Sequence, residues 1–188
     1  PQVHAAGSDV LRVGLIGCGG RGTGAAEQAL TADSNTKLVA MADAFQDRLD
    51  ESLSALKGSA VAGRVDVPRE RQYIGFDAYK QVIDQVDVVL LTTPPHFRPI
   101  HFAYAVEKGV HAFVEKPIAT DATGVRAFLK SCEEAKSKNL SVVSGLCWRY
   151  HDAIFAHASA SPIVRLNTSL AGFESFTSVQ KYPMRSNW

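Results

Sequence analysis

The feature that most constrains this fold is a regular alternation of short apolar runs with segments of helical composition. The apolar runs are rich in aliphatic and β-branched residues, and the segments between them are rich in good helix formers. Strands that alternate with helices form a parallel sheet covered by helices on both faces. We therefore predict an α/β fold with a doubly wound sheet. Strands are predicted at residues 11–17, 36–43, 73–76, 86–93, 111–115 and 140–146, and helices at 22–32, 46–57, 77–84, 100–109 and 121–138, with a loop at 58–72.

The C-terminal part of the chain breaks this rhythm. Residues 163–172 alternate apolar and polar side chains, which is typical of a strand with one exposed face. Such a strand does not suit a sheet that is buried on both faces, so we assign it to a second sheet. We predict an N-terminal arm at 1–9, an α/β domain at 10–147, and the beginning of a truncated second α/β domain at 148–188.

The segment GLIGCGGRG joins the first predicted strand to the first predicted helix. Gly17, Gly19 and Gly22 fit the pattern G-x-G-x-x-G, with Gly20 and Arg21 inside the same loop. In this pattern the first glycine allows a tight turn, the second lets the backbone approach a pyrophosphate, and the third lets the helix pack closely. The loop predicts dinucleotide binding. The alternatives are a tight structural turn or a site for another nucleotide, such as a methyl donor.

Asp43 ends the second predicted strand, where a carboxylate can accept hydrogen bonds from an adenosine ribose. The same charge repels a ribose 2′-phosphate, so NAD is favoured over NADP. Arg21 and Arg48 would weaken that repulsion. The alternative is that Asp43 is an ordinary strand end or helix cap.

Two further strands end in unusual residues. Ligands of doubly wound sheets lie outside the carboxyl ends of the strands, so the turns that follow the strands line the binding crevice. We expect the glycine loop to share one crevice with the two other turns, which are Thr92-Thr93-Pro94-Pro95-His96 and Glu115-Lys116-Pro117.

Together these motifs resemble the N-terminal domain of the glucose-fructose oxidoreductase / inositol dehydrogenase family of NAD(P)-dependent sugar enzymes. The resemblance spans about residues 10–150, and it rests on VGLIGCGGRG, Asp43, TTPPHFRP, EKGVHAFVEKP and the later WRY. VEKP together with the upstream TPP is more specific than the glycines. The resemblance implies a Rossmann-type domain and an oxidoreductase that moves a hydride between nicotinamide and the hydroxyl-bearing carbon of a sugar or cyclitol.

The resemblance implies that Glu115 and Lys116 lie beside the nicotinamide. Lys116 would be the catalytic residue that helps a substrate hydroxyl gain or lose its proton, and Pro117 would bend the chain, often through a cis bond. A lysine that is partly desolvated beside a cationic nicotinamide has a lowered pKa, which suits a general acid or base. The alternative for this charged pair is a surface salt bridge, although neighbours in an extended segment point to opposite sides.

The resemblance also implies a path for the rest of the cofactor. Thr92, Thr93 and Pro94 would pass along its ribose and phosphates, while Trp148 and Arg149 would flank the nicotinamide and the substrate. Trp148 could instead pack beneath the second sheet.

His96 would lie at the mouth of the cleft. Many relatives carry a histidine two positions later, where this chain has Arg98. A lone histidine in a loop is often only solvated, so the role of His96 stays open.

Members of this family add a C-terminal α/β domain with an Asp-x-x-x-His motif, whose histidine usually acts as the principal acid/base. This chain ends at Trp188, and His151 and His157 lie too early to be that histidine. We therefore expect a fragment or a truncated product, with a homo-oligomeric full-length form. Two other functions stay open: an NAD-dependent glycosidase of the same family, which returns the hydride to its substrate, and a non-catalytic nucleotide-binding module.

Composition argues against several other classes of protein. A formal net charge of +1 gives no general attraction to nucleic acid, and no run of eighteen apolar residues predicts a membrane span. The three cysteines have no disulfide-type or metal-type spacing, so no metal is expected. The opening PQVHAAGSD resembles either the end of an export signal, which implies a periplasmic protein, or a mobile arm of a cytoplasmic one.

Overall fold

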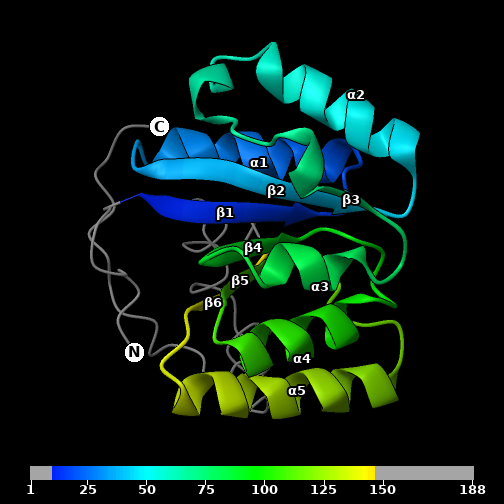
Figure 1. The fold of residues 1–188 in the computed structure, drawn as a ribbon. Coiled ribbons are helices and arrows are strands. Elements are labelled where there is room, and N and C mark those ends of the chain that lie inside the picture. The colour runs from blue at the N-terminus through cyan, green and yellow to red at the C-terminus, as the bar shows by residue number, and fades with distance from the viewer. Residues whose placement is uncertain (1–9, 147–188) are drawn as a thin grey trace, which may run out of the picture. The chain divides into compact units, whose positions relative to one another are not determined.

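The computed structural model describes residues 10–146, and these residues form the predicted α/β fold. Six parallel strands make one sheet in the order β3-β2-β1-β4-β5-β6 (Figure 1). The strand order reverses between β1 and β4, which is the switch point of a doubly wound sheet. The strands are β1 (Leu11–Ile16), β2 (Thr36–Asp43), β3 (Gln72–Ile74), β4 (Val88–Leu91), β5 (His111–Val114) and β6 (Val142–Ser144).

Helices cover both faces of this sheet. Figure 1 shows α1 and α2 on one face and α3, α4 and α5 on the other. The helices are α1 (Gly20–Ala32), α2 (Gln46–Lys57), α3 (Ala78–Ile83), α4 (Arg98–Lys108) and α5 (Ala122–Ser137). The predicted loop at 58–72 contains two short 3-10 turns, Ala62–Arg64 and Arg69–Arg71.

Each face of the sheet has its own apolar core because successive side chains of a strand point to opposite faces. Leu15 lies in the core under α1 and α2, whereas its neighbour Ile16 lies in the core under α3, α4 and α5. Phe102 and Phe128 stack in this second core at a centroid distance of 4.4 Å and fix α5 against α4. The near-continuous apolar runs of the sequence are therefore strands that are buried on both sides.

The helix ends follow local signals in the sequence. Asp121 caps α5 by accepting a hydrogen bond from the amide of Gly124 at 2.6 Å. Gly109 ends α4 in the left-handed region at φ 76°, which a glycine adopts without strain. Helix α1 begins two residues earlier than predicted because Gly20 and Arg21 already form its first turn.

No helix of the described part of the chain has the length and apolarity needed to cross a membrane. The predicted N-terminal arm, Trp148, Arg149 and the strand at 163–172 lie outside the described residues.

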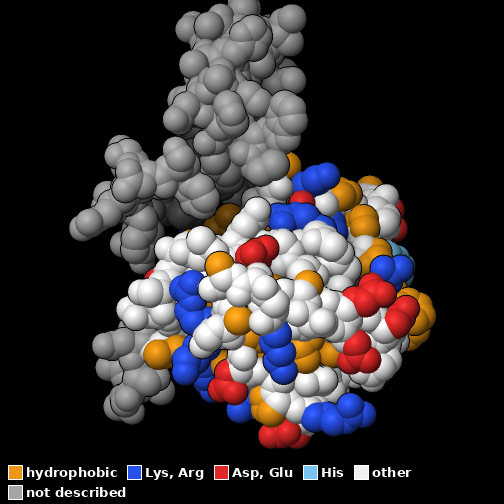
Figure 2. All heavy atoms as spheres, turned by 90° about the horizontal axis from the view of Figure 1, so that it is seen from above, with side chains coloured by type: hydrophobic (Ala, Val, Ile, Leu, Met, Phe, Trp, Pro, Cys, Tyr) orange, Lys and Arg blue, Asp and Glu red, His pale blue; other side chains and the backbone are white. Residues whose placement is uncertain are grey.

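On the face seen in Figure 2, which is the side of α1 and α2, basic and acidic side chains are interspersed.

Candidate functional site

A cavity of about 440 Å³ lies at the carboxyl ends of β1, β2 and β4. The predicted glycine loop and the predicted turn after β4 both line it, and so does the start of α4. Its walls comprise Ile16, Gly17, Gly19, Ala42, Asp43, Ala44, Phe45, Arg48, Gly75, Phe76, Tyr79, Thr92, Thr93, Pro94, Phe97, Arg98 and His101. A cavity at this place is where a doubly wound sheet binds its ligand.

The glycines of the loop differ in what surrounds them. A Cβ on Gly22 would overlap the carbonyl oxygen of Gly17, and a Cβ on Gly17 would lie 2.6 Å from the amide nitrogen of Thr93. A Cβ on Gly19 or on Gly20 would meet no atom within 4 Å. Gly17 and Gly22 are therefore required for packing, whereas Gly19 leaves open space at the cavity wall.

Thr92 holds the glycine loop in place. Its hydroxyl donates to the carbonyl oxygen of Gly17 at 2.7 Å and lies 3.0 Å from that of Ile16. The hydroxyl of Thr92, a residue expected to pass along the ribose and phosphates of the cofactor, is thus engaged with the loop, so in this structure Thr92 shapes the site through the backbone.

Asp43 also shapes the loop from the end of β2. Its carboxylate accepts hydrogen bonds from the amides of Cys18 at 2.6 Å and of Phe45 at 3.0 Å. Each carboxylate oxygen can accept more than one hydrogen bond, so these contacts leave acceptor capacity toward the cavity. The predicted ribose-binding role and the alternative structural role are therefore compatible in one side chain.

The turn after β5 lies beside the cavity without lining it, so only two of the three turns that were expected to share one crevice line it in this structure. Glu115 is only 4% exposed and accepts from Nε of Arg21 at 2.9 Å, which joins this turn to the first turn of α1. Lys116 is exposed while its neighbour Glu115 is buried, which fits side chains that point to opposite sides of an extended segment. The Lys116–Pro117 bond is cis, as the family resemblance implies.

Arg98 links this turn to the cavity, a connection that sequence reasoning missed. The side chain is 5% exposed, lines the cavity, and donates from Nη1 to the carbonyl oxygen of Pro117. Among the described residues its Nε has no hydrogen-bond partner. Burial lowers the pKa of Arg98, and the nearby charge of Glu115 opposes that shift. Arginines in the first turn of a helix are usually exposed, so the sequence marked Arg98 only as a departure from relatives that carry a histidine there and did not indicate its burial.

His101 is the second residue that the sequence did not reveal. It is 4% exposed, and burial lowers its pKa to about 4, so the ring is neutral near pH 7. Its Nδ1 lies 3.4 Å from the hydroxyl of Thr93, and its ring stacks on Tyr79 at 4.2 Å. By contrast, His96 is exposed and packs edge-on against Phe97 at 5.4 Å.

Comparison with known proteins decides the family. A family model described as an oxidoreductase family with an NAD-binding Rossmann fold matches residues 11–144. The chain belongs to this family. The resemblance to glucose-fructose oxidoreductases and inositol dehydrogenases is thereby confirmed for this oxidoreductase domain.

Individual relatives share about a third of the residues in the matched part of this chain. A glycosyl hydrolase family 109 protein of Shewanella pealeana is 33% identical over 114 residues, which are 59% of this chain and 24% of the relative. The chain thus spans about a quarter of the length of that curated relative.

Solved structures share its fold. An NAD-binding oxidoreductase of Klebsiella pneumoniae superimposes with a TM-score of 0.63 at 21% identity, covering 84% of this chain and 39% of that one. A myo-inositol 2-dehydrogenase of Lactobacillus plantarum gives 0.62 at 24% identity, with 89% and 48% covered.

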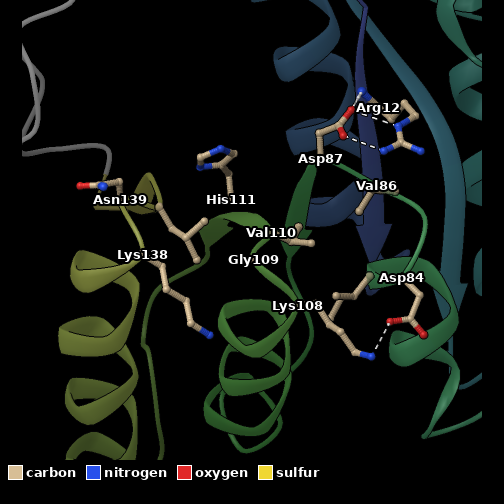
Figure 3. Close-up of a pocket in the computed structure, with 12 residues that line it drawn as sticks. Arg12, Asp84, Val86, Asp87, Lys108, Gly109, Val110, His111, Lys138 and Asn139 are labelled. Carbon is tan, nitrogen blue, oxygen red and sulfur yellow. Dashed lines mark hydrogen bonds and ion pairs between the residues drawn. The ribbon is translucent and has the colours of Figure 1, made fainter. Parts of the chain in front are cut away.

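A second cavity of about 540 Å³ lies at the opposite edge of the oxidoreductase domain (Figure 3). Its charged groups are paired: Arg12 with Asp87 at 2.7 Å, and Lys108 with Asp84 at 3.4 Å. Lys138 donates to the carbonyl oxygen of Val106 at 2.9 Å, at the C-terminus of α4. Because these groups satisfy one another and the helix ends, we assign this cavity a structural role.

Proposed function

We propose that this chain is the cofactor domain of an NAD(H)-dependent oxidoreductase that acts on a hydroxyl-bearing carbon of a sugar or cyclitol. The observation that carries the proposal is the cavity at the switch point, lined by the glycine loop, Asp43 and the turn after β4. When bound, the nicotinamide supplies the acceptor or donor of the hydride.

The open wall at Gly19 and the amides at the start of α1 suit a pyrophosphate. The N-terminus of a helix presents unpaired amides and the positive end of the helix dipole, both of which favour an anion. Arg21 adds a cation in the same turn, although Glu115 neutralises it.

Asp43 supports NAD as the preferred cofactor. Its carboxylate lines the cavity at the end of β2, so a 2′-phosphate there would meet a negative charge. Arg48 also lines the cavity, but its guanidinium lies 3.8 Å from the carboxylate of Glu51. We therefore expect Arg48 to relieve that repulsion only partly.

Lys116 is the residue proposed to assist proton transfer at the substrate hydroxyl. It is exposed and lies on the turn after β5. Two hydrogen bonds hold this turn: Arg21 of α1 donates to Glu115, and Arg98, which lines the cavity, donates to the carbonyl oxygen of Pro117. An ammonium on such a fixed turn can donate a proton to a substrate oxygen and take it back in the reverse reaction.

Titration of the protein with NAD and with NADP by isothermal calorimetry tests the proposal. We expect NAD to bind about tenfold or more tightly than NADP, and Asp43→Asn to reduce this preference because it removes the repelling charge. Asp47→Asn removes the same charge from α2 outside the cavity, and it is expected to leave the preference unchanged. Absence of binding by both cofactors would contradict the proposal.

An NAD-dependent glycosidase is a second candidate. It is favoured by the curated relative of Shewanella pealeana, whose name is that of a glycosyl hydrolase family and which matches 59% of this chain. The full natural gene product, incubated with NAD and nitrophenyl glycosides, separates the two reactions. Nitrophenol release without accumulation of NADH indicates the glycosidase, whereas NADH accumulation with free sugars indicates the dehydrogenase.

A further inference from the structure

Four aromatic rings form a stacked column along one wall of the cavity, and we define the aromatic column as Phe76, Phe97, His101 and Tyr79. Consecutive centroids are 5.7 Å, 6.0 Å and 4.2 Å apart, and the planes of neighbouring rings differ by only 20° to 25°. All four residues line the cavity. They come from the loop before α3, from α3 itself and from the start of α4.

The column runs from the core to solvent. His101 and Tyr79 are buried, Phe97 is half-buried, and Phe76 is 67% exposed at the outer end. Because the inner rings are fixed in the core, they restrict the tilt of the outer ring. Phe76 therefore presents a supported aromatic face with nothing from the described residues stacked on its outer side.

The most exposed large apolar side chains lie at the cavity. Among the large hydrophobic side chains of residues 10–146, Phe76 and Phe45 are the two most exposed, at 67% and 63%. Both line the cavity. Exposed apolar side chains that gather at one site mark a binding surface, whereas isolated ones need no explanation.

The backbone places Phe76 next to the proposed ribose site. The amide of Gly75 donates to the carbonyl oxygen of Asp43 at 3.0 Å, so the residue that follows Gly75 starts beside Asp43. In a dinucleotide the base is attached to the ribose. A ribose held by Asp43 thus carries its base toward the rings of the cavity mouth.

We propose that Phe76, supported by the aromatic column, is the platform on which the purine base of the cofactor stacks. This inference rests on the proposed function, and it deepens that function by naming the residue that recognises the base. Stacking on a phenyl ring uses the face of the base and adds to affinity without reading its edge.

The test measures binding of NAD to variants of Phe76 by isothermal calorimetry. We expect Phe76→Leu, which keeps an apolar side chain but removes the π face, to bind NAD roughly 5- to 100-fold more weakly. Phe76→Trp keeps the face and is expected to stay within about threefold of the original protein. Ile100→Ala removes a side chain of α4 that is 54% exposed and lies outside the cavity, so it is expected to have no effect.

The outcomes separate the two proposals. If the original protein binds NAD and Phe76→Leu binds it equally well, the platform is wrong and the proposed function stands. Equal weakening by Phe76→Leu and Ile100→Ala would also overturn the platform, because the loss would not depend on the aromatic face. If the original protein binds neither NAD nor NADP, both proposals fall together.

Discussion

At the scale of single residues, a substitution at Gly19 is expected to affect cofactor binding more than folding. A Cβ at this position meets no atom within 4 Å and the backbone has φ −70°, so alanine fits the folded structure. Under the proposed function, the same Cβ would occupy space assigned to the pyrophosphate. We expect Gly19→Ala to weaken NAD binding about tenfold or more, with a loss of stability within about 1 kcal/mol from the poorer helix cap.

Gly24→Ala is the matched control for this prediction. Gly24 also has open space around it, but it lies inside α1 and outside the cavity. We expect the variant to bind NAD normally and to be more stable by up to about 1 kcal/mol, because alanine favours a helix. Calorimetry and thermal unfolding measure the two effects, and equal affinity of both variants would argue against a pyrophosphate at Gly19.

Arg98 contributes more to the site than to the fold. Its guanidinium is buried, and its Nε has no partner among the described residues, so burial of this charge is poorly compensated. Arg98→Met replaces it with an apolar side chain but removes the donor to Pro117. We expect the free energy of unfolding to change by less than about 2 kcal/mol, while NAD affinity falls because the turn that carries Lys116 is less fixed.

Urea unfolding and calorimetry on the same variant check both halves of this prediction. Arg98→Lys keeps the charge with a different donor geometry and is expected to restore part of the affinity. A loss of stability well above that limit would show that Arg98 mainly holds the fold.

At the scale of elements, the end of α4 depends on the backbone of one glycine. Gly109 has φ 76°, and a Cβ there would meet no atom within 4 Å, so strain is the main cost of a substitution. We expect Gly109→Ala to destabilise the domain by about 1–2 kcal/mol in urea unfolding.

Gly63 provides the control for this element. It also has open space, but its φ is not positive, so Gly63→Ala is expected to change stability by less than about 0.5 kcal/mol. Equal losses in the two variants would mean that backbone strain at Gly109 is not the cause.

At the scale of the whole molecule, burial of His101 couples stability to pH. Its folded-state pKa is lowered to about 4 from an ordinary value of 6.5. Between these two values the unfolded chain is protonated at His101 and the folded chain is not. The part of the folding stability that depends on a neutral His101 is fully present above pH 6.5 and is lost as the pH falls toward 4. The loss approaches about 1.4 kcal/mol per pH unit at most.

Urea unfolding at pH 7, 6 and 5 measures this slope. We expect His101→Phe, which keeps a ring against Tyr79, to have a shallower slope than the original protein. Some slope is expected to persist because burial also lowers the pKa of His111. An unchanged slope in the variant would show that His101 titrates normally in the folded protein.

The sequence by itself determined the elements and the turns that follow the strands. Alternating apolar runs, the cap at Asp121 and the stop at Gly109 are local patterns, and each acts within a few residues of itself. Because the carboxyl ends of parallel strands meet at one edge, the same patterns also predicted that the glycine loop, Asp43 and the turn after β4 would surround one cavity. They predicted the turn after β5 in the same crevice as well, but that turn lies outside the cavity lining.

Only the tertiary structure decided which distant groups meet. Glu115 pairs with Arg21, 94 positions away, and Arg98 is buried against the carbonyl of Pro117. The aromatic column joins rings from two separate parts of the chain, residues 76–79 and 97–101. These contacts depend on how three helices and the loops beside them are brought together over the same end of the sheet, and no short-range pattern in the sequence encodes that placement.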